Sequence, residues 1–207
     1  MRLAIDEFDP KRFGLVTGSN CTPLFPVRSA EKGQRTLAKK LAYERHFKFY
    51  DELSTWQMEH GHDNEEFALE YCHTFFDKTV KKGRFIQVGE AGGTMDAEGD
   101  GVWDWKCPVT MQGWLSYLYD GMSDKEENQM QMYMFLSGKR KARIGAFLME
   151  TWKMTDNGLV YPILKNKRMI VCETKVNPDW VIKLKKNLPK VVEMRDEYIN
   201  QLKKQFG

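Results

Sequence analysis

The chain contains 207 residues, of which 42% are hydrophobic and 29% charged; this is a globular composition, and a chain of this length can bury about 70% of its unfolded surface. Its net charge of +3 is too small to identify a polyanionic partner. No apolar stretch approaches the roughly 20 residues that cross a bilayer, and the 4 cysteines lie too far apart for a metal finger or a disulfide-stapled miniprotein. Disordered, membrane-spanning and disulfide-rich classes are therefore excluded, and we expect a soluble, unexported protein with reduced thiols.

Helical periodicity and end signals predict several helices in a chain that no repeat or linker divides. They are expected over residues 27–50, about 64–76, 109–119, 123–138 and 179–205. We therefore predict a single domain over residues 1–207, with its core in about 11–175 and an amphipathic helix closing the chain.

Particular residues mark the ends of these helices. Asn64 is interpreted as the N-cap of the second helix. Ser123 and Glu126 form an S-x-x-E capping box, and Gly138 ends the helix that this box starts. Pro189 predicts a kink or a restart in the last helix.

Short apolar segments between glycines predict β-strands. They are expected over residues 84–90, 92–96, 101–107, 143–151 and 167–172. Strands interleaved with helices indicate an α/β protein, in which helices flank a mixed central sheet.

The segment from Gly92 to Pro108 combines acidic residues with a lysine. Because successive side chains of a strand alternate between faces, Asp104 and Lys106 are expected on one side, and Asp96 can approach them from the preceding turn. The opposite side receives Trp103, Trp105 and Cys107. Two carboxylates beside an ammonium can hold a divalent cation and orient a water for phosphate hydrolysis. The alternative is an ordinary solvated hairpin.

Five segments in order along the chain carry a wider pattern, namely Arg12–Ser19 (RFGLVTGS), Gly61–Glu65 (GHDNE), Thr94–Ala97 (TMDA), Asp104–Pro108 (DWKCP) and Gln129–Gln131 (QMQ). They are similar to R-x-G-x-[IV]-T-[AG]-S, G-x-x-x-E, S-P-D-G, E-x-K-C-P and Q-x-Q of the λ exonuclease/YqaJ viral recombinase group. This group belongs to the PD-(D/E)xK nucleases. The resemblance covers about residues 11–137 and implies a restriction-endonuclease-like core.

The resemblance implies a metal site for Mg²⁺, with Mn²⁺ as a substitute. Asp96 and Asp104 would be its carboxylate ligands, and the backbone carbonyl of Trp105 would complete the set. Glu65, placed in the first turn of its helix, would reach the metal-bound waters. The alternative for Glu65 is a purely structural role, in which its negative charge stabilises the N-terminus of the helix.

The same resemblance implies roles for residues around the metal. Lys106 would activate or orient the attacking water, and Gln129 would position that water or the lysine. Taken alone, Gln129 is an ordinary helix-surface residue, and the neighbouring Tyr133 is interpreted as a core or subunit contact. The chain departs from the family pattern at Met95 and Ala97, and Asp104 replaces the commoner Glu.

Two segments are predicted to bind DNA: the opening segment Arg12–Ser19 and a run of basic residues after the Gln129 helix. Arg12, Thr17 and Ser19 match the segment that holds the 5′-terminal phosphate in the family. The run after the Gln129 helix is expected to contact duplex phosphates, and its members are Lys139, Arg140, Lys141 and Arg143.

Together these matches imply an exonuclease that degrades one strand of linear double-stranded DNA, 5′ to 3′, in phage-type recombination. The resemblance also implies a ring-shaped homotrimer, a single-strand annealing partner, and a phage or prophage protein in the cytoplasm of a bacterial host. Two alternatives stay open. One is a structure-specific or restriction-like endonuclease, and the other is a DNA-binding protein whose catalytic centre has degenerated.

Overall fold

The computed structural model describes residues 10–26, 30–49, 55–149, 151–152 and 159–207. Its helices are α1 (Ala30–Phe47), α2 (Trp56–Phe75), α3 (Met111–Tyr119), α4 (Asp124–Ser137) and α5 (Pro178–Phe206). Its strands are β1 (Val16–Thr17), β2 (Lys81–Lys82), β3 (Phe85–Val88), β4 (Ala91–Thr94), β5 (Ala97–Glu98), β6 (Val102–Lys106), β7 (Lys141–Phe147), β8 (Thr151–Trp152), β9 (Leu159–Val160) and β10 (Met169–Lys175). Short 3-10 turns lie at Pro10–Arg12, Thr22–Leu24 and Lys165–Lys167.

Two sheets organise the molecule. The larger has the order β10-β7-β6-β5-β2, in which β6 and β7 run parallel and the other neighbours antiparallel. The smaller has the order β1-β4-β3 and also mixes both directions. The chain crosses from the smaller sheet to the larger at Met95 and Asp96, between β4 and β5. The predicted α/β class with a mixed central sheet is confirmed.

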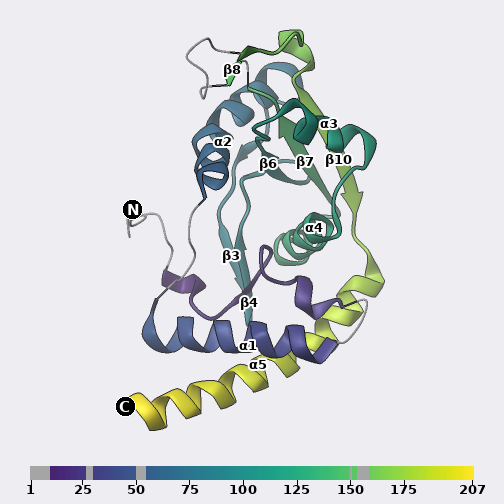
Figure 1. Ribbon diagram of the computed structural model, residues 1–207. Coiled ribbons are helices and arrows are strands. Elements are labelled where there is room, and N and C mark those ends of the chain that lie inside the picture. The colour runs from purple at the N-terminus through teal and green to yellow at the C-terminus, as the bar shows by residue number, and fades with distance from the viewer. Residues whose placement is uncertain (1–9, 27–29, 50–54, 150, 153–158) are drawn as a thin grey trace.

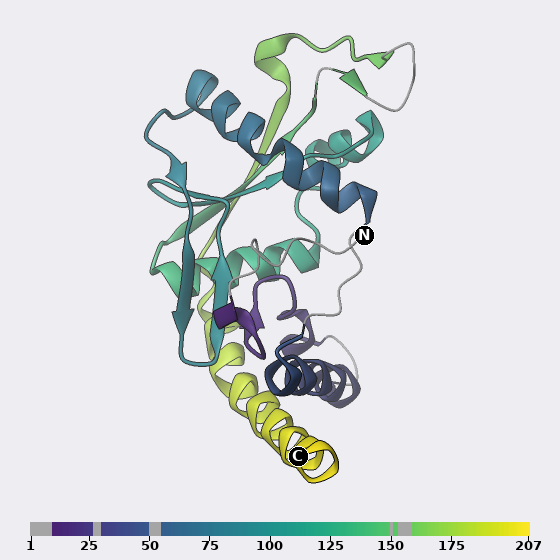
Figure 2. The ribbon, with the colours of Figure 1, turned by 90° about the vertical axis from the view of Figure 1, so that its left-hand side faces the viewer.

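Helices cover both faces of the larger sheet and form a layer beneath it (Figure 1). Helix α4 packs against β6, β7 and β10 and extends across β3 and β4, so it joins the two sheets. Helix α2 packs on β6, where its Ala68 and Tyr71 share a buried cluster with Trp103 and Trp105. Helices α1 and α5 lie side by side at the base, and α5 extends away from the sheet (Figure 2).

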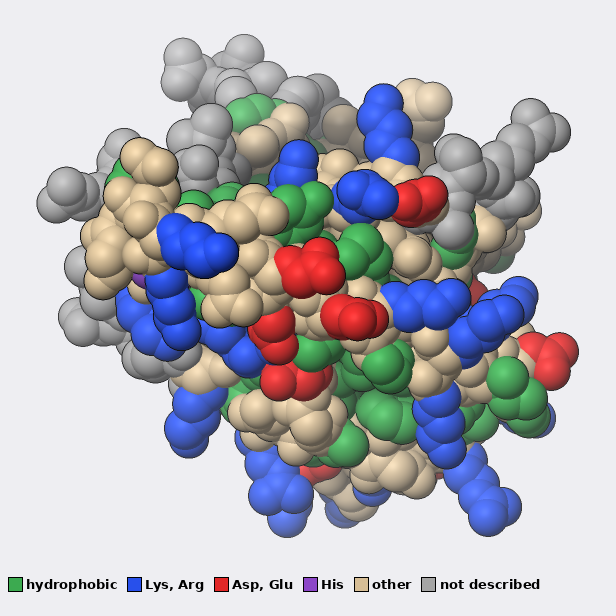
Figure 3. Space-filling model, turned by 90° about the horizontal axis from the view of Figure 1, so that it is seen from below, with side chains coloured by type: hydrophobic (Ala, Val, Ile, Leu, Met, Phe, Trp, Pro, Cys, Tyr) green, Lys and Arg blue, Asp and Glu red, His purple; other side chains and the backbone are tan. Residues whose placement is uncertain are grey.

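The base layer presents a surface of mixed charge. Seen from below, Lys and Arg side chains surround a central group of Asp and Glu side chains (Figure 3). A phosphate backbone would meet both attraction and repulsion there. None of the described helices is long and apolar enough to cross a bilayer.

Most predicted helices are confirmed, and the capping box of α4 is present as predicted. The Ser123 side chain accepts from the Glu126 backbone, the Glu126 side chain accepts from the Ser123 backbone, and Gly138 follows with φ 71°. Helix α5 runs through Pro189, so a restart there is wrong, and a kink stays a prediction. Of the first predicted helix, residues 27–29 and 50 lie outside the described residues, as does residue 150 of the strand predicted over 143–151.

The predicted start of the second helix is wrong. Helix α2 begins at Trp56, where the Thr55 side chain accepts a hydrogen bond from Met58 N, and Asn64 lies inside the helix. The Asn64 side chain donates to His60 O at 2.6 Å instead of capping a terminus. Gly61 weakens the local helix preference, but packing of the later turns on the sheet outweighs it. Strands β2 and β5, of two residues each, were too short to predict.

Candidate active site

One β-hairpin places the two predicted metal-binding carboxylates opposite each other. Ala97 pairs with Trp103 in the β5–β6 register, so Asp96 and Asp104 come next on the two strands. The Asp96 carboxylate accepts a hydrogen bond from Trp105 N at 2.7 Å. Asp104 is only 2% exposed and faces α4. The hairpin therefore brings both carboxylates to one side of the larger sheet.

The expected alternation along β6 is confirmed. Trp103 and Trp105 stack with ring centroids 5.1 Å apart in the cluster beneath α2. Lys106, two residues from Asp104, places its Nζ 2.6 Å from Asp104 Oδ2. The tryptophans anchor the strand from one face, so the ion pair on the other face has a defined position.

Helix α4 contributes an amide that contacts Asp104 from the opposite side. Gln129 Nε2 donates to Asp104 Oδ1 at 2.9 Å and to the Tyr133 hydroxyl at 3.0 Å. Lys106 and Gln129 thus hold the two oxygens of one buried carboxylate. This arrangement fixes the orientation of Asp104 before any ligand arrives.

Glu65 reaches the site from the middle of α2, not from a first turn, so the predicted position in its helix is wrong. The interpretation as a charge at a helix N-terminus falls with it. His62 Nδ1 lies 3.7 Å from the Glu65 carboxylate. Burial raises the pKa of Glu65, and the charge of Asp104 raises it further. Glu65 therefore lies within electrostatic reach of the hairpin carboxylates, although α2 covers the tryptophan side of the sheet.

The carboxylates concentrate negative charge in a poorly solvated place. Burial raises the pKa of Asp96 well above its usual value, and the charges of Asp104 and Glu65 raise it further. Burial also raises the pKa of Asp104, which Lys106 opposes. For Lys106, burial lowers the pKa, but the surrounding carboxylates, chiefly Asp104, outweigh burial and leave it above its usual value. A divalent cation at this point would relieve the repulsion among the acids.

The donor chemistry fits a hard cation. Among the described residues, no three His, Cys, Asp or Glu side chains form a preformed metal site. Asp96 and Asp104 supply two carboxylates, and Mg²⁺ commonly takes one or two carboxylates and keeps several waters. The Trp105 N–H points toward Asp96. Because the N–H and C=O of one strand residue project to the same side, the Trp105 carbonyl also faces this region.

The opening segment lies against α4 beside the site. A Cβ on Gly18 would stand 2.8 Å from the Tyr133 ring and 3.1 Å from Gln129 Cγ, so only glycine allows this approach. Burial raises the pKa of Tyr133, and Arg12 opposes the rise, which places the Arg12 guanidinium within electrostatic reach of the Tyr133 hydroxyl. Arg12 itself ends the short turn at Pro10–Arg12, and its contact with a phosphate stays a prediction.

Thr17 and Ser19 flank the close contact at Gly18. Their hydroxyl oxygens lie 3.1 Å apart, and Thr17 N donates to Asn20 Oδ1 at 2.7 Å. Thr17 is buried while Ser19 is exposed, so the turn presents one hydroxyl to solvent beside α4.

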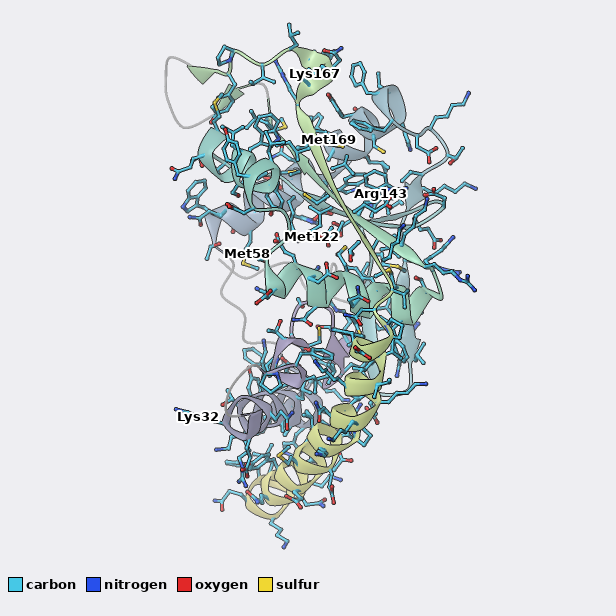
Figure 4. The ribbon with its side chains drawn as sticks, turned by 90° about the vertical axis from the view of Figure 1, so that its right-hand side faces the viewer. Lys32, Met58, Met122, Arg143, Lys167 and Met169 are labelled. Atoms are coloured by element: carbon cyan, nitrogen blue, oxygen red, sulfur yellow. The ribbon has the colours of Figure 1, made fainter. Side chains whose placement is uncertain are left out.

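The basic run that was predicted to bind DNA does not lie beside the carboxylates. Lys139 Nζ donates to Gly99 O at 2.7 Å, and both Lys141 and Arg143 pair with Asp100. Lys141 and Arg143 lie at the start of β7, where Arg143 pairs with Trp103, whereas Lys106 pairs with Ala146 further along. Figure 4 shows Arg143 projecting from the sheet region, well away from Lys32 on α1. The structure does not bring this run together with the carboxylates, and its contact with DNA stays a prediction.

Two residues near the site were not predicted to act there. Tyr133, interpreted as a core or subunit contact, is buried, but its hydroxyl accepts from Gln129. The i, i+4 spacing of the two residues was the signal that could have shown this. Glu126, predicted only as part of the capping box, lies within electrostatic reach of Lys106. Gln131 instead ties the end of β10 to α4, because its Nε2 donates to Lys175 O at 2.7 Å.

Comparisons with known proteins identify the fold. No protein-family model matches the sequence, and no curated protein sequence matches it. Among solved structures, an alkaline exonuclease (LHK-Exo) from Laribacter hongkongensis is similar, with a TM-score of 0.73 and 16% identity over 94% of each chain. LHK-Exo in complex with dAMP gives 0.75 and 16% over 97% of each chain. A phage-related exonuclease from Haemophilus somnus 129PT gives 0.70 and 18%, over 93% of this chain and 96% of that chain. The chain therefore has the fold of these exonucleases, in agreement with the PD-(D/E)xK core that its motifs indicate.

Proposed function

We propose that this protein is a metal-dependent deoxyribonuclease that degrades one strand of linear double-stranded DNA from an end. The observation that carries the proposal is the convergence of Asp96, Asp104 and Lys106 from one hairpin with Gln129 from α4. The fold shared with exonucleases supports it. LHK-Exo binds dAMP in one crystal structure, and dAMP is a mononucleotide of the kind that stepwise cleavage of DNA releases.

The hairpin would hold Mg²⁺, or Mn²⁺ as a substitute, through Asp96, Asp104 and the Trp105 carbonyl, with Glu65 acting through bound water. Such a cation supplies Lewis-acid polarisation of the scissile phosphate and charge neutralisation at the leaving oxygen. Enzymes that hydrolyse phosphate esters lower the barrier by about 20 kcal/mol, and one lysine alone does not supply that. The excess of buried negative charge is therefore the feature that most favours a metal site.

Lys106 and Gln129 have complementary parts in this proposal. Lys106 stays an ammonium at neutral pH, because its pKa lies above its usual value. It would therefore orient a water or a phosphate oxygen by donating hydrogen bonds, rather than by accepting a proton. Gln129 keeps Asp104 turned toward the site through the 2.9 Å hydrogen bond.

The polarity of cleavage rests on the opening segment. Arg12, Thr17 and Ser19 match a segment that holds a 5′-terminal phosphate in the λ exonuclease group, and this segment lies against Gln129 and Tyr133. A guanidinium and hydroxyl groups are suitable donors for a phosphate monoester. We therefore propose 5′ to 3′ degradation that starts at a phosphorylated end.

Further parts of the proposal rest on the family resemblance alone. They are a ring-shaped homotrimer around the DNA, transfer of the exposed strand to a single-strand annealing protein, and a role in phage-type recombination. Sedimentation velocity at several protein concentrations tests the trimer, and a monomer at micromolar concentration would contradict it.

The test of activity uses linear and closed circular duplex, each with Mg²⁺, with Mn²⁺ and then with EDTA. The expected result is release of mononucleotides from the linear duplex, an intact circle, and no cleavage in EDTA. A nicked or cut circle would show an endonuclease instead. Binding without cleavage in either metal would show a degenerate DNA-binding protein.

Site variants connect the activity to these residues. Asp96→Asn, Asp104→Asn and Lys106→Ala are expected to abolish turnover while the proteins remain folded. Asp120→Asn, an exposed carboxylate at the end of α3, is the matched control and should retain full activity. Arg12→Ala should lose the preference for 5′-phosphorylated ends. Full activity in any of the first three variants, or an unchanged end preference in the last, would contradict the assigned role.

A further inference from the structure

The buried ring of Tyr133, on α4, packs against the backbone of the smaller sheet at two glycines. Thr17 pairs with Gly92, so Gly18 follows at the end of β1 and Gly93 is its neighbour in β4. A Cβ would stand 2.8 Å from the Tyr133 ring at Gly18 and 2.9 Å from it at Gly93, so neither position accepts a side chain without a shift. The two glycines therefore fix where the Tyr133 hydroxyl lies.

The Tyr133 hydroxyl oxygen contacts the amide of Gln129. Gln129 Nε2 donates to this oxygen at 3.0 Å and to Asp104 Oδ1 at 2.9 Å. An amide nitrogen carries two protons, so these two hydrogen bonds use both of them. Because a carboxylate only accepts, the amide cannot turn its oxygen toward Asp104 without losing the hydrogen bond there. The two contacts together set the orientation of the amide.

The remaining polar atom of this amide is Gln129 Oε1, which accepts no hydrogen bond from the described residues. It is not one of the described polar atoms that are fully enclosed without a partner, so solvent reaches it. Since the amide contacts Asp104, a proposed metal ligand, this oxygen lies at the candidate active site. An amide oxygen accepts hydrogen bonds and cannot donate them, so it can bind the O–H of a water but does not attract a phosphate oxygen.

We propose that Tyr133 is a positioning residue that, by accepting the second Nε2 proton of Gln129, directs Gln129 Oε1 at the water that attacks the scissile phosphate. This inference rests on the proposed nuclease function. It adds a residue that the family motifs do not include, because the Q-x-Q segment ends at Gln131. It also commits Gln129 to act on the water as a hydrogen-bond acceptor, and not on the phosphate as a donor.

Tyr133→Phe removes the acceptor and keeps the ring against the two glycines. Without the acceptor the Gln129 amide can rotate about its hydrogen bond to Asp104, and its oxygen loses its fixed direction. One neutral hydrogen bond corresponds to about 3- to 10-fold in a rate, so kcat on linear duplex should fall by that factor. KM for DNA should stay close to that of the wild type. A raised KM with an unchanged kcat would show that the hydroxyl binds DNA instead, and would overturn the proposal.

Tyr71→Phe is the matched control. Tyr71 is 7% exposed, against 6% for Tyr133, and its hydroxyl accepts from Arg168 N at 3.0 Å. The same atom is therefore removed at the same burial, but from α2, on the tryptophan side of the sheet. This variant should keep the wild-type kcat. Equal losses of kcat in both variants, or an unchanged kcat in Tyr133→Phe, would overturn the proposal.

A second measurement does not depend on nuclease activity. NMR of the full-length protein without DNA follows the two side-chain amide protons of Gln129, which are assigned by their loss in Gln129→Met. In Tyr133→Phe one of the two resonances should move upfield, toward the position of an exposed glutamine amide, while Tyr71→Phe leaves both in place. Unmoved resonances in Tyr133→Phe would overturn the inference. A wild-type protein that cleaves no DNA but shows this change would refute the proposed function, and with it the catalytic part of the inference, while establishing the contact between Tyr133 and Gln129.

Discussion

Replacing Gln129 with glutamate tests the geometry of the site without assuming any reaction. The amide donates to Asp104 Oδ1 at 2.9 Å, and Gln129 is only 9% exposed. In Gln129→Glu a carboxylate replaces this donor at nearly the same volume. Two carboxylate charges would then lie about 4 Å apart, and at an effective dielectric constant of about 20 their repulsion is about 4 kcal/mol. One of the pair would avoid most of this repulsion by taking up a proton.

The destabilisation should therefore depend on pH. A carboxyl group whose pKa is raised by folding favours the folded state at low pH. This stabilisation is lost as the pH rises from the pKa of the group in the unfolded protein to its pKa in the folded protein. Urea unfolding of Gln129→Glu should show a loss of about 2 to 4 kcal/mol at pH 8 and clearly less at pH 5.

The control places the same charge one residue earlier. Asn128 Oδ1 accepts from Trp180 Nε1 at 2.8 Å, and an aspartate keeps this oxygen. It loses the exposed hydrogen bond that Asn128 Nδ2 donates to Asp124 O at 2.7 Å, so Asn128→Asp should cost about 1 kcal/mol, equally at both pH values. The reasoning is refuted if Gln129→Glu matches the wild type at pH 8, or if both variants lose the same stability independently of pH. Either result would mean that Gln129 does not face a buried carboxylate.

The other predictions concern stability. Folding raises the pKa of Asp96, so its charge destabilises the metal-free protein at pH values above the unfolded pKa of about 3.9. Asp96→Asn should therefore raise the melting temperature in EDTA at pH 8 and hardly change it at pH 4. An unchanged melting temperature at pH 8 would contradict this. Arg195 is buried and donates to Gly14 O at 2.8 Å, so Arg195→Met should cost about 2 to 4 kcal/mol in urea unfolding, and a cost below about 1 kcal/mol would argue against this contact. Gly18→Ala should cost about 1 to 3 kcal/mol, since the new methyl group meets a tyrosine ring at 2.8 Å. Gly33 lies inside α1, and the nearest atom to a Cβ added there would be Pro23 Cβ at 3.6 Å. Gly33→Ala should therefore gain about 0.5 to 1 kcal/mol of stability instead.

The hairpin was predictable because it depends on local rules. A strand alternates its side chains between two faces, and this alone placed Asp104 and Lys106 together, with Trp103 and Trp105 opposite. The capping box at Ser123 is equally local and is present as predicted. These features follow from neighbours within a few residues, which a sequence shows directly.

Features that depend on distant packing were not predictable in the same way. The start of α2 at Trp56 depends on how its later turns dock on β6, because its first turns include Gly61 and are largely polar. Likewise, no local signal shows that Lys141 and Arg143 pair with Asp100, a residue in a different turn. A run of basic residues in a sequence therefore shows available charge but not how much of it the fold already uses.

Strand register places some residues of the site, and helix packing places the others. Asp96, Asp104 and Lys106 share one hairpin, so their relative positions follow from the register of β5 and β6. Glu65 and Gln129 arrive on helices that cover opposite faces of the sheet, and their positions depend on the packing of each helix. A substitution on the α2 side of this core, such as at Ala68, would therefore shift Glu65 while the register of β5 and β6 kept the two carboxylates together. The carboxylate pair is thus the robust part of this site, and the helix-borne groups are the part that packing tunes.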